Sequence, residues 1–216
     1  MTKDEPTREE RIRRKSRKRR EDEKQEVRQA ILSAATALFL KLGTEGFSLR
    51  GVAEEAGYSP GTIYLYFENK DDLLYTVADE GFQRFLIMLH DAASDNLEPI
   101  DQLRQMANAY VSFGLDYPAH YRVMFIDRTD FIASDERAQD WQATLQALRD
   151  TVQKAIDSGD FQPVDVAATS DALWAFLHGA VSLAITMQSF DAERRASMLS
   201  MTHQLIDTLV DGLRKG

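Results

Sequence analysis

The sequence FSLRGVAEEAGYSPGTIYLYFENKDDL, residues 47–73, is the most informative part of the chain. It predicts two short helices, one after Ser48 and one after Ser59, because a serine at this position accepts hydrogen bonds from the free N–H groups of a helix's first turn. Gly57 is expected to end the first helix, and Pro60 suits the first position of the second. Two short helices joined by a tight turn that contains glycine form a helix-turn-helix.

The second of these helices, which we expect over 60–67, has the features of an element that enters a DNA groove. Its first turn carries small residues, Ser59, Gly61 and Thr62, which allow the backbone to approach a duplex and offer hydroxyl and amide groups to it. Tyr64 and Tyr66 can donate hydrogen bonds to phosphates from the next turn. Ile63 and Phe67 are expected to point into the core.

Over residues 47–73 the chain resembles the tetracycline-repressor (TetR) family of transcription regulators at nearly every position, and the close resemblance extends over about 25–77. The resemblance implies a DNA-facing surface made by the following residues: Ser48 and Arg50 in the first helix, Ser59, Gly61, Thr62, Tyr64 and Tyr66 in the second, and Lys70 after it. Two positions depart from the family pattern. Pro60 replaces a residue that is often polar or basic, and Leu65 replaces a common His or Tyr, so Leu65 would either contact a thymine methyl group or simply pack.

The residues before this region are strongly basic. Arg11 to Arg20 include eight basic residues and no acidic one, with Glu9, Glu10 and Glu21 to Glu23 on either side. Such a block repels itself and favours a polyanionic partner, because each phosphate that it neutralises releases counterions. We expect residues 1–23 to be a disordered arm that contacts DNA through Arg13, Arg14, Arg17 and Lys18. The alternative is a solvated tail that only improves solubility.

The rest of the chain has helical periodicity throughout, which predicts an all-α fold. We expect a helix-turn-helix domain over 24–70 and a C-terminal domain over 71–216. The predicted helices outside 47–67 cover 24–42, 70–93, 100–115, 118–127, 135–158, 164–188 and 191–214. Gly43 ends the first helix, and Asn69 caps the helix that starts at residue 70.

The C-terminal domain is rich in aromatic residues and methionine, and the resemblance implies a pocket there for a small effector. Such pockets are mainly apolar with a few polar groups, and the candidates are Met106, Tyr110, Phe113, Tyr121, Arg122, Phe125, Trp174 and His178. Residues 117–125 and 173–179 look like the effector-domain subtype named for a Trp-His-Gly signature. His178 would either sense a ligand or be a core histidine with satisfied hydrogen bonds.

The last two helices are expected to form a homodimer. Residues 172–187 are apolar nearly all round, which does not suit a helix in a solvated monomer. The resemblance implies that this helix and the final one pair with their symmetry mates; the alternative is deep burial within one subunit. A twofold dimer would place two reading helices about one or more turns of DNA apart, so the operator should be nearly palindromic.

Composition excludes several other classes of protein. The chain has no cysteine, which removes disulfides, thiolate metal sites and a cysteine nucleophile. The start lacks the apolar stretch of a signal peptide and residues 172–187 are too few to span a bilayer, so we expect a cytoplasmic protein with no membrane association. The four histidines are too scattered to suggest a metal site, and no cofactor is expected.

The resulting expectation is a dimeric repressor, not an enzyme, that is released from its operator by a small apolar or amphipathic effector. A DNA-binding regulator controlled by a protein partner is the first alternative. A helical enzyme is a third interpretation, with Asp127, Arg128, Asp130 and His178 as acid and base. No nucleophile, metal cluster or phosphate loop in the sequence supports that interpretation.

Overall fold

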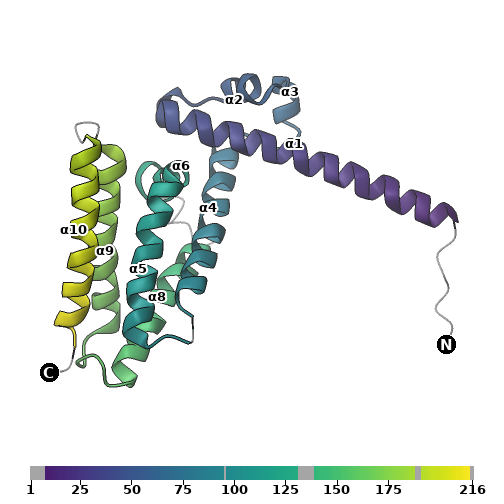
Figure 1. Cartoon of the computed structure of the whole chain (residues 1–216). Helices are drawn as coiled ribbons and strands as arrows, with labels where there is room; N and C mark the ends of the chain where they lie inside the picture. The colour runs from purple at the N-terminus through teal and green to yellow at the C-terminus, as the bar shows by residue number, and fades with distance from the viewer. Residues whose placement is uncertain (1–7, 95, 131–138, 188–190, 215–216) are drawn as a thin grey trace, which may run out of the picture. The chain divides into compact units, whose positions relative to one another are not determined.

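The computed structural model of the chain describes residues 8–94, 96–130, 139–187 and 191–214. Every regular secondary-structure element within these ranges is a helix (Figure 1), which confirms the predicted all-α fold. The chain divides into two compact units, Met1–Thr76 and Val77–Gly216. The helix α4 starts in the first unit and continues into the second.

The first unit contains α1 (Arg8–Gly46), α2 (Leu49–Ala56) and α3 (Pro60–Ile63). The turn chemistry predicted for this region is confirmed: the side chains of Ser48 and Ser59 accept hydrogen bonds from the first turns of α2 and α3, and Gly57 ends α2 with φ 74°. The helix α3 is shorter than predicted. After Ile63 the N–H groups of Leu65 and Tyr66 bond three residues back, to Thr62 O at 3.1 Å and Ile63 O at 3.0 Å, so the chain continues as tight turns to Phe67.

The helix α1 is much longer than predicted, and this corrects the disordered arm expected over 1–23. Residues 8–23 are helical and continuous with the predicted helix over 24–42, while 1–7 lie outside the described residues. Arg, Lys and Glu have high helix propensity, neither Gly nor Pro occurs between Arg8 and Leu42, and ion pairs such as Arg19–Glu23 at 3.3 Å join successive turns. Gly43 leaves the helical conformation at φ 66°, where the end of the helix was expected.

The second unit contains the rest of α4 (Lys70–Ala92), which Asn69 caps as predicted, since its side chain accepts from Asp72 N at 2.9 Å. The helix α5 (Pro99–Asp116) follows. The predicted helix over 118–127 is split into α6 (Pro118–Arg122) and a π-helical turn, η1 (Val123–Asp127). The remaining helices are α8 (Gln139–Asp157), α9 (Val166–Thr186) and α10 (Ala192–Gly212), so parts of the ranges 135–158 and 164–188 lie outside the described residues.

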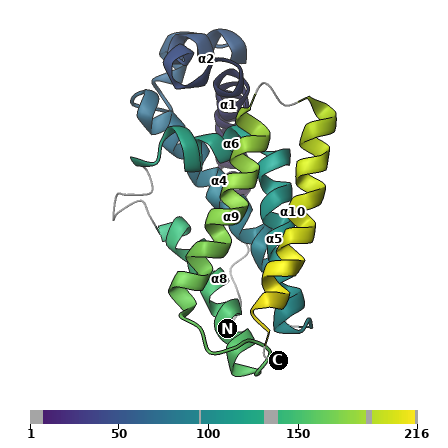
Figure 2. The same ribbon diagram turned by 90° about the vertical axis from the view of Figure 1, so that its left-hand side faces the viewer.

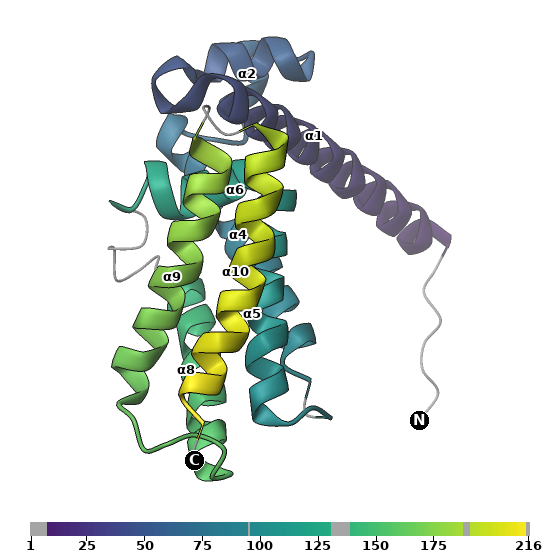
Figure 3. The same cartoon turned by 60° about the vertical axis from the view of Figure 1, so that its left-hand side comes forward.

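Within the second unit, α9 and α10 lie side by side with α5 packed against both (Figure 2, Figure 3). Gly114 of α5 makes this close packing possible, because a Cβ atom there would lie 2.2 Å from Cγ1 of Val181 on α9. The core is formed largely by aromatic and aliphatic side chains of α4, α5, α6 and η1, among which Phe113 and Tyr121 are fully buried. One side of α9 and α10 stays outside this core.

Candidate DNA interface and effector cavity

The predicted DNA-facing residues of the helix-turn-helix lie on α2, on α3 and in the turn after it. Ser48 and Ser59 both serve as helix caps, with Gly51 N and Thr62 N at 3.1 Å from their respective Oγ atoms. The Thr62 hydroxyl lies 2.9 Å from Ser59 Oγ. Both serines are exposed, so the two helix starts that they cap face solvent.

Large side chains on this surface point away from the core. Tyr64 is 60% exposed and Leu65 is 79% exposed, whereas Ile63 and Phe67 are buried, as expected from the sequence. Leu65 therefore does not pack within its own chain. Arg50 is exposed and lies 3.6 Å from Glu54 one turn later, and Tyr66 is half-buried.

Gly61 is not required by the fold around it. Its φ is not in the left-handed region, and a Cβ atom there would meet only Ser59 Oγ, at an ordinary contact distance of 3.7 Å. A side chain would thus fit within the protein. The glycine leaves the backbone of the first turn of α3 open to close approach from outside.

The structure gives Lys70 an intramolecular partner. Its Nζ donates to the carbonyl oxygen of Thr44 at 2.5 Å and the side chain is half-buried, which ties the start of α4 to the end of α1. An ammonium group has three donors. A phosphate contact by Lys70 therefore stays a prediction that is compatible with this bond.

The basic residues expected to contact DNA lie along the N-terminal half of α1. Arg13, Arg14, Arg17 and Lys18 are all exposed. Because residues 11–20 are helical, their eight basic side chains are distributed around all sides of the helix. This segment is consequently a charged rod and presents positive charge in every direction.

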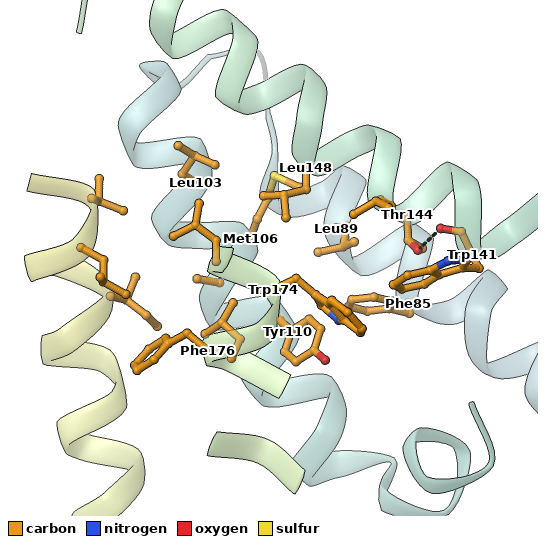
Figure 4. Close-up of a pocket in the computed structure, with 17 residues that line it drawn as sticks. Phe85, Leu89, Leu103, Met106, Tyr110, Trp141, Thr144, Leu148, Trp174 and Phe176 are labelled. Carbon is orange, nitrogen blue, oxygen red and sulfur yellow. Dashed lines mark hydrogen bonds between the residues drawn. The ribbon is translucent and has the colours of Figure 1, made fainter. Parts of the chain in front are cut away.

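The second unit contains a partly open cavity of ≈ 60 Å³ between five helices (Figure 4). Its lining is aliphatic and aromatic apart from four side chains with an N–H or O–H group, Tyr110, Trp141, Thr144 and Trp174. The residues that line it are Phe85 and Leu89 of α4; Leu103, Met106, Ala107 and Tyr110 of α5; Trp141, Thr144, Leu145 and Leu148 of α8; Leu173, Trp174, Phe176 and Leu177 of α9; and Ile206, Leu209 and Val210 of α10. Among the described residues none with a charge lines the cavity.

The structure divides the predicted pocket residues into two groups. Met106, Tyr110 and Trp174 line the cavity, whereas Phe113, Tyr121, Arg122, Phe125 and His178 do not. Phe113, Tyr121 and Phe125 are core residues, and Arg122 forms an ion pair with Asp127, Nη2 to Oδ2 at 3.0 Å. Sequence reasoning missed the contributions of α4, α8 and α10, because helical periodicity shows which face of a helix is apolar but not which helices meet around a space.

A chain of hydrogen bonds starts at the cavity wall. The hydroxyl oxygens of Tyr110 and Tyr121 lie 2.8 Å apart, and Tyr121 Oη is 2.8 Å from Nδ1 of His178. The other ring nitrogen of His178 is 3.3 Å from Ser182 Oγ. Both nitrogens of His178 therefore have partners within the chain, which favours the structural alternative for this residue over direct ligand sensing.

Burial keeps the titratable residues of this hydrogen-bond chain uncharged. It raises the pKa of Tyr121 to about 12 and that of Tyr110 well above its usual value, with the neighbouring tyrosine adding to the latter shift. Burial also lowers the pKa of His178. At neutral pH this hydrogen-bond chain thus consists of three hydroxyl groups and a neutral imidazole.

A second histidine of this unit, His120 on α6, should make stability depend on pH. Burial lowers its pKa to about 4, and the positive charge of Arg84 contributes. Because an unfolded histidine titrates near 6.5, protonation favours the unfolded chain, and the free energy of unfolding should fall by about 2 kcal/mol from this residue between pH 7 and pH 5. Urea unfolding at both pH values measures this change in the free energy of unfolding.

The variant His120→Asn tests whether His120 causes this pH dependence. Its matched control is His203→Asn, which alters an exposed histidine on α10. His120→Asn should remove most of the 2 kcal/mol difference, and His203→Asn should leave it. An unchanged pH dependence in His120→Asn would contradict the prediction.

An apolar face runs along α9 and α10 outside the core. It includes Leu183, Met187, Met201, Leu205 and Leu209, which are between 38% and 52% exposed. A Cβ atom on Gly179 of α9 would meet nothing within 4 Å. The helix α9 is long and apolar enough to cross a membrane by length and composition alone, as are core helices of many soluble proteins. Only 22% of its apolar stretch is buried within the chain.

Two family models match the chain. Residues 31–77 match the N-terminal model of bacterial regulatory proteins of the tetR family, and residues 103–209 match the model of the tetracyclin repressor-like C-terminal domain. The first therefore covers the end of α1, α2, α3 and the start of α4, and the second covers most of α5 to α10 but not the α4 residues that line the cavity. The Trp-His-Gly subtype stays a prediction.

Individual transcriptional regulators are also similar to this chain in sequence or in structure. An uncharacterized HTH-type transcriptional regulator of Haemophilus influenzae is 36% identical over 83 residues, which are 38% of this chain and 44% of that protein, so the chain spans less than half of that relative's length. The uncharacterized HTH-type transcriptional regulator YfiR of Bacillus subtilis is 28% identical over 162 residues, 68% of this chain and 74% of that protein. The structure of the transcriptional regulator FadR from Bacillus subtilis in complex with stearoyl-CoA has the same fold, with a TM-score of 0.70 and 20% identity over 86% of this chain and 99% of that chain.

Proposed function

Because the chain belongs to the TetR family of bacterial regulatory proteins, we propose that it is a dimeric, cytoplasmic repressor that binds a nearly palindromic operator and is released by a small apolar or amphipathic effector. The surface formed by α2, α3 and the turn after α3 carries this proposal. Its two capped helix starts are exposed, and Gly61 leaves the backbone open although the fold does not need a glycine there. No catalytic role is proposed.

The apolar face on α9 and α10 supports the dimer. Burying a leucine side chain stabilises an interface by about 1.5–3 kcal/mol, and a twofold axis would bury each residue of this face twice. The open space next to Gly179 would allow a partner helix to approach closely. A symmetric dimer would in turn present two copies of α3 to successive major grooves.

The helix α4 supports control by a ligand. It begins at Lys70, bonded to Thr44 in the first unit, and Phe85 and Leu89 further along the same helix line the cavity in the second. A ligand that changes the position of these two side chains would act on a continuous helix that leads to the DNA-binding unit. The ligand would shift the equilibrium between DNA-binding and released states by its difference in affinity for the two.

The size of the cavity keeps a second candidate function open. Ligand pockets usually measure about 300–1,000 Å³, whereas this cavity measures ≈ 60 Å³. A regulator that responds to a protein partner would need no larger space. Ligand binding to the cavity, tested below, distinguishes the two candidates.

The experiment that tests the DNA-binding proposal is selection of bound sequences from random duplex DNA with the purified full chain, read by sequencing. We expect a nearly palindromic consensus, with half-sites separated by one or more helical turns. Recovery of random sequences would contradict a sequence-specific dimeric regulator.

The basic segment of α1 should add contacts to phosphates. Replacing Arg13, Arg14, Arg17 and Lys18 by glutamine, which keeps helix propensity, should weaken binding to all duplexes alike. Each lost phosphate contact lowers the slope of log affinity against log salt by about 0.9, so the four substitutions should reduce the slope by at least about 2. Binding titrations at several salt concentrations measure this.

A matched control has glutamine in place of four basic residues of the second unit, Arg149, Lys154, Arg194 and Arg214, and so changes the net charge equally. This variant should keep the salt slope of the parent protein. Equal slopes for both variants and the parent would show that the basic segment only affects solubility.

A further inference from the structure

Trp174 lines the cavity, and its indole N–H is buried at the wall beside Tyr110. Among the described residues this N–H makes no hydrogen bond of good geometry, and its interaction with the Tyr110 hydroxyl only partly offsets the rise in the pKa of Tyr110. A buried donor without a partner has an appreciable free-energy cost, and a polar group that is left unused at a cavity wall is a natural contact for a ligand. Tyr110 lies next to Trp174 at the same wall (Figure 4).

The hydroxyl of Tyr110 is held in place by the hydrogen-bond chain behind it. Tyr121, His178 and Ser182 continue that chain away from the cavity, at 2.8, 2.8 and 3.3 Å. Hydroxyl groups and a neutral imidazole can each donate and accept, so the donor-to-acceptor direction of these hydrogen bonds can be reversed along the whole series. When His178 donates to Tyr121 and Tyr121 donates to Tyr110, the Tyr110 O–H is free to donate toward the cavity, next to the Trp174 N–H.

The rest of the lining restricts what can enter. Among the described residues no charged side chain faces the cavity, so a charged ligand group would lose its hydration without compensation. The volume of ≈ 60 Å³ is less than half of the about 150 Å³ that accommodates a benzene ring. The lining side chains nevertheless extend across the unit from α10 to Trp141 of α8 (Figure 4). A slender molecule therefore fits with less rearrangement than a bulky ring.

We infer that the cavity binds an uncharged, slender hydrocarbon molecule with one oxygen acceptor, such as a ketone, aldehyde or ester carbonyl, and that Trp174 Nε1 and Tyr110 Oη hydrogen-bond that oxygen. This inference rests on the proposed function and gives the chemical class of its effector. Tyr121 and His178 act as positioning residues for Tyr110.

Three probes of similar size test the ligand class. 2-Hexanone has the carbonyl, 2-methyl-1-hexene has a methylene group in place of the oxygen, and hexanoate has a charge. A hydrogen bond in a buried site should make the ketone bind about threefold to tenfold more tightly than the alkene. Hexanoate should bind at least about a hundredfold more weakly than the ketone.

Indole signals in the ¹H–¹⁵N spectrum of the full-length protein report the contact directly. The chain has two tryptophans, and Trp141→Phe assigns the two signals. The ketone should move the Trp174 N–H signal downfield by more than the alkene does. The Trp141 signal serves as the internal control for general changes in the cavity, because this residue lines the same space.

Two variants keep the test falsifiable if one of them unfolds. Trp174→Phe and Tyr110→Phe should each bring the ratio of ketone affinity to alkene affinity closer to one, whatever the change in cavity volume does to both affinities together. Equal binding of ketone and alkene, tighter binding of hexanoate, or no binding of any probe would each overturn the inference. A preparation that selects a palindrome but binds no probe refutes the ligand class alone, whereas one that binds the ketone but selects no DNA sequence refutes the proposed regulator.

Discussion

Glutamate in place of Leu205 is expected to convert the protein from a dimer to a monomer. Leu205 is 40% exposed in the middle of the apolar face on α9 and α10. In a twofold dimer the substitution removes two buried leucines and introduces two carboxylates without partners. The loss of about 2 kcal/mol from each copy raises the dissociation constant at least about a thousandfold. Sedimentation velocity over a range of protein concentrations measures the dissociation constant of the dimer.

Operator binding should fail together with the dimer, because a single reading helix contacts only half of a palindromic site. The matched control is Ile87→Glu, which introduces the same charge at a leucine-sized residue of α4 that is 62% exposed. This control should stay dimeric and bind DNA. A Leu205→Glu variant that remains a dimer, or a parent protein that is already monomeric, would rule out this face as the interface.

A methyl group at Gly61 should separate stability from DNA binding. Because a Cβ atom fits at 3.7 Å from Ser59 Oγ, Gly61→Ala should leave the fold intact and stabilise it by up to roughly 0.5–1 kcal/mol, since alanine loses less conformational freedom than glycine. The same methyl group would obstruct close approach of a base edge. Each disturbed base contact costs about 1–3 kcal/mol, so operator affinity should fall about tenfold to a hundredfold.

Thermal unfolding and operator titration of Gly61→Ala together measure the two effects. Gly212→Ala, at the end of α10, is the matched control, because a Cβ atom there meets nothing within 4 Å and the residue lies in the other unit. It should not change operator affinity. An unchanged affinity in Gly61→Ala would show that the backbone of α3 does not approach the DNA closely.

The parts of the fold that depend on neighbouring residues could be predicted from the sequence. Ser48, Gly57, Ser59 and Asn69 perform the capping or terminating roles expected of them, because those roles depend on side-chain chemistry within one turn. The prediction was wrong for residues 8–23, where repulsion among like charges was given more weight than helix propensity and pairs such as Arg19–Glu23.

The cavity was harder to predict, because it depends on how distant helices cross. Tyr110 and Trp174 were expected at a pocket and line one. Phe125 and Tyr121 have the same apolar and aromatic character but are 4% and 0% exposed in the core. Composition cannot distinguish a side chain that borders a space from one that fills it. The DNA-contacting roles of the helix-turn-helix residues stay predictions.

The distribution of positive charge around α1 has a consequence for how a target site would be found. A helix with cations on every side contacts phosphates equally well in any rotation about its own axis, so it has no preferred register on the duplex. Such a contact persists while the protein moves along DNA of any sequence. The basic segment would therefore shorten the search by keeping the protein close to DNA between encounters, while the surface formed by α2, α3 and the turn after α3 would determine where it stops.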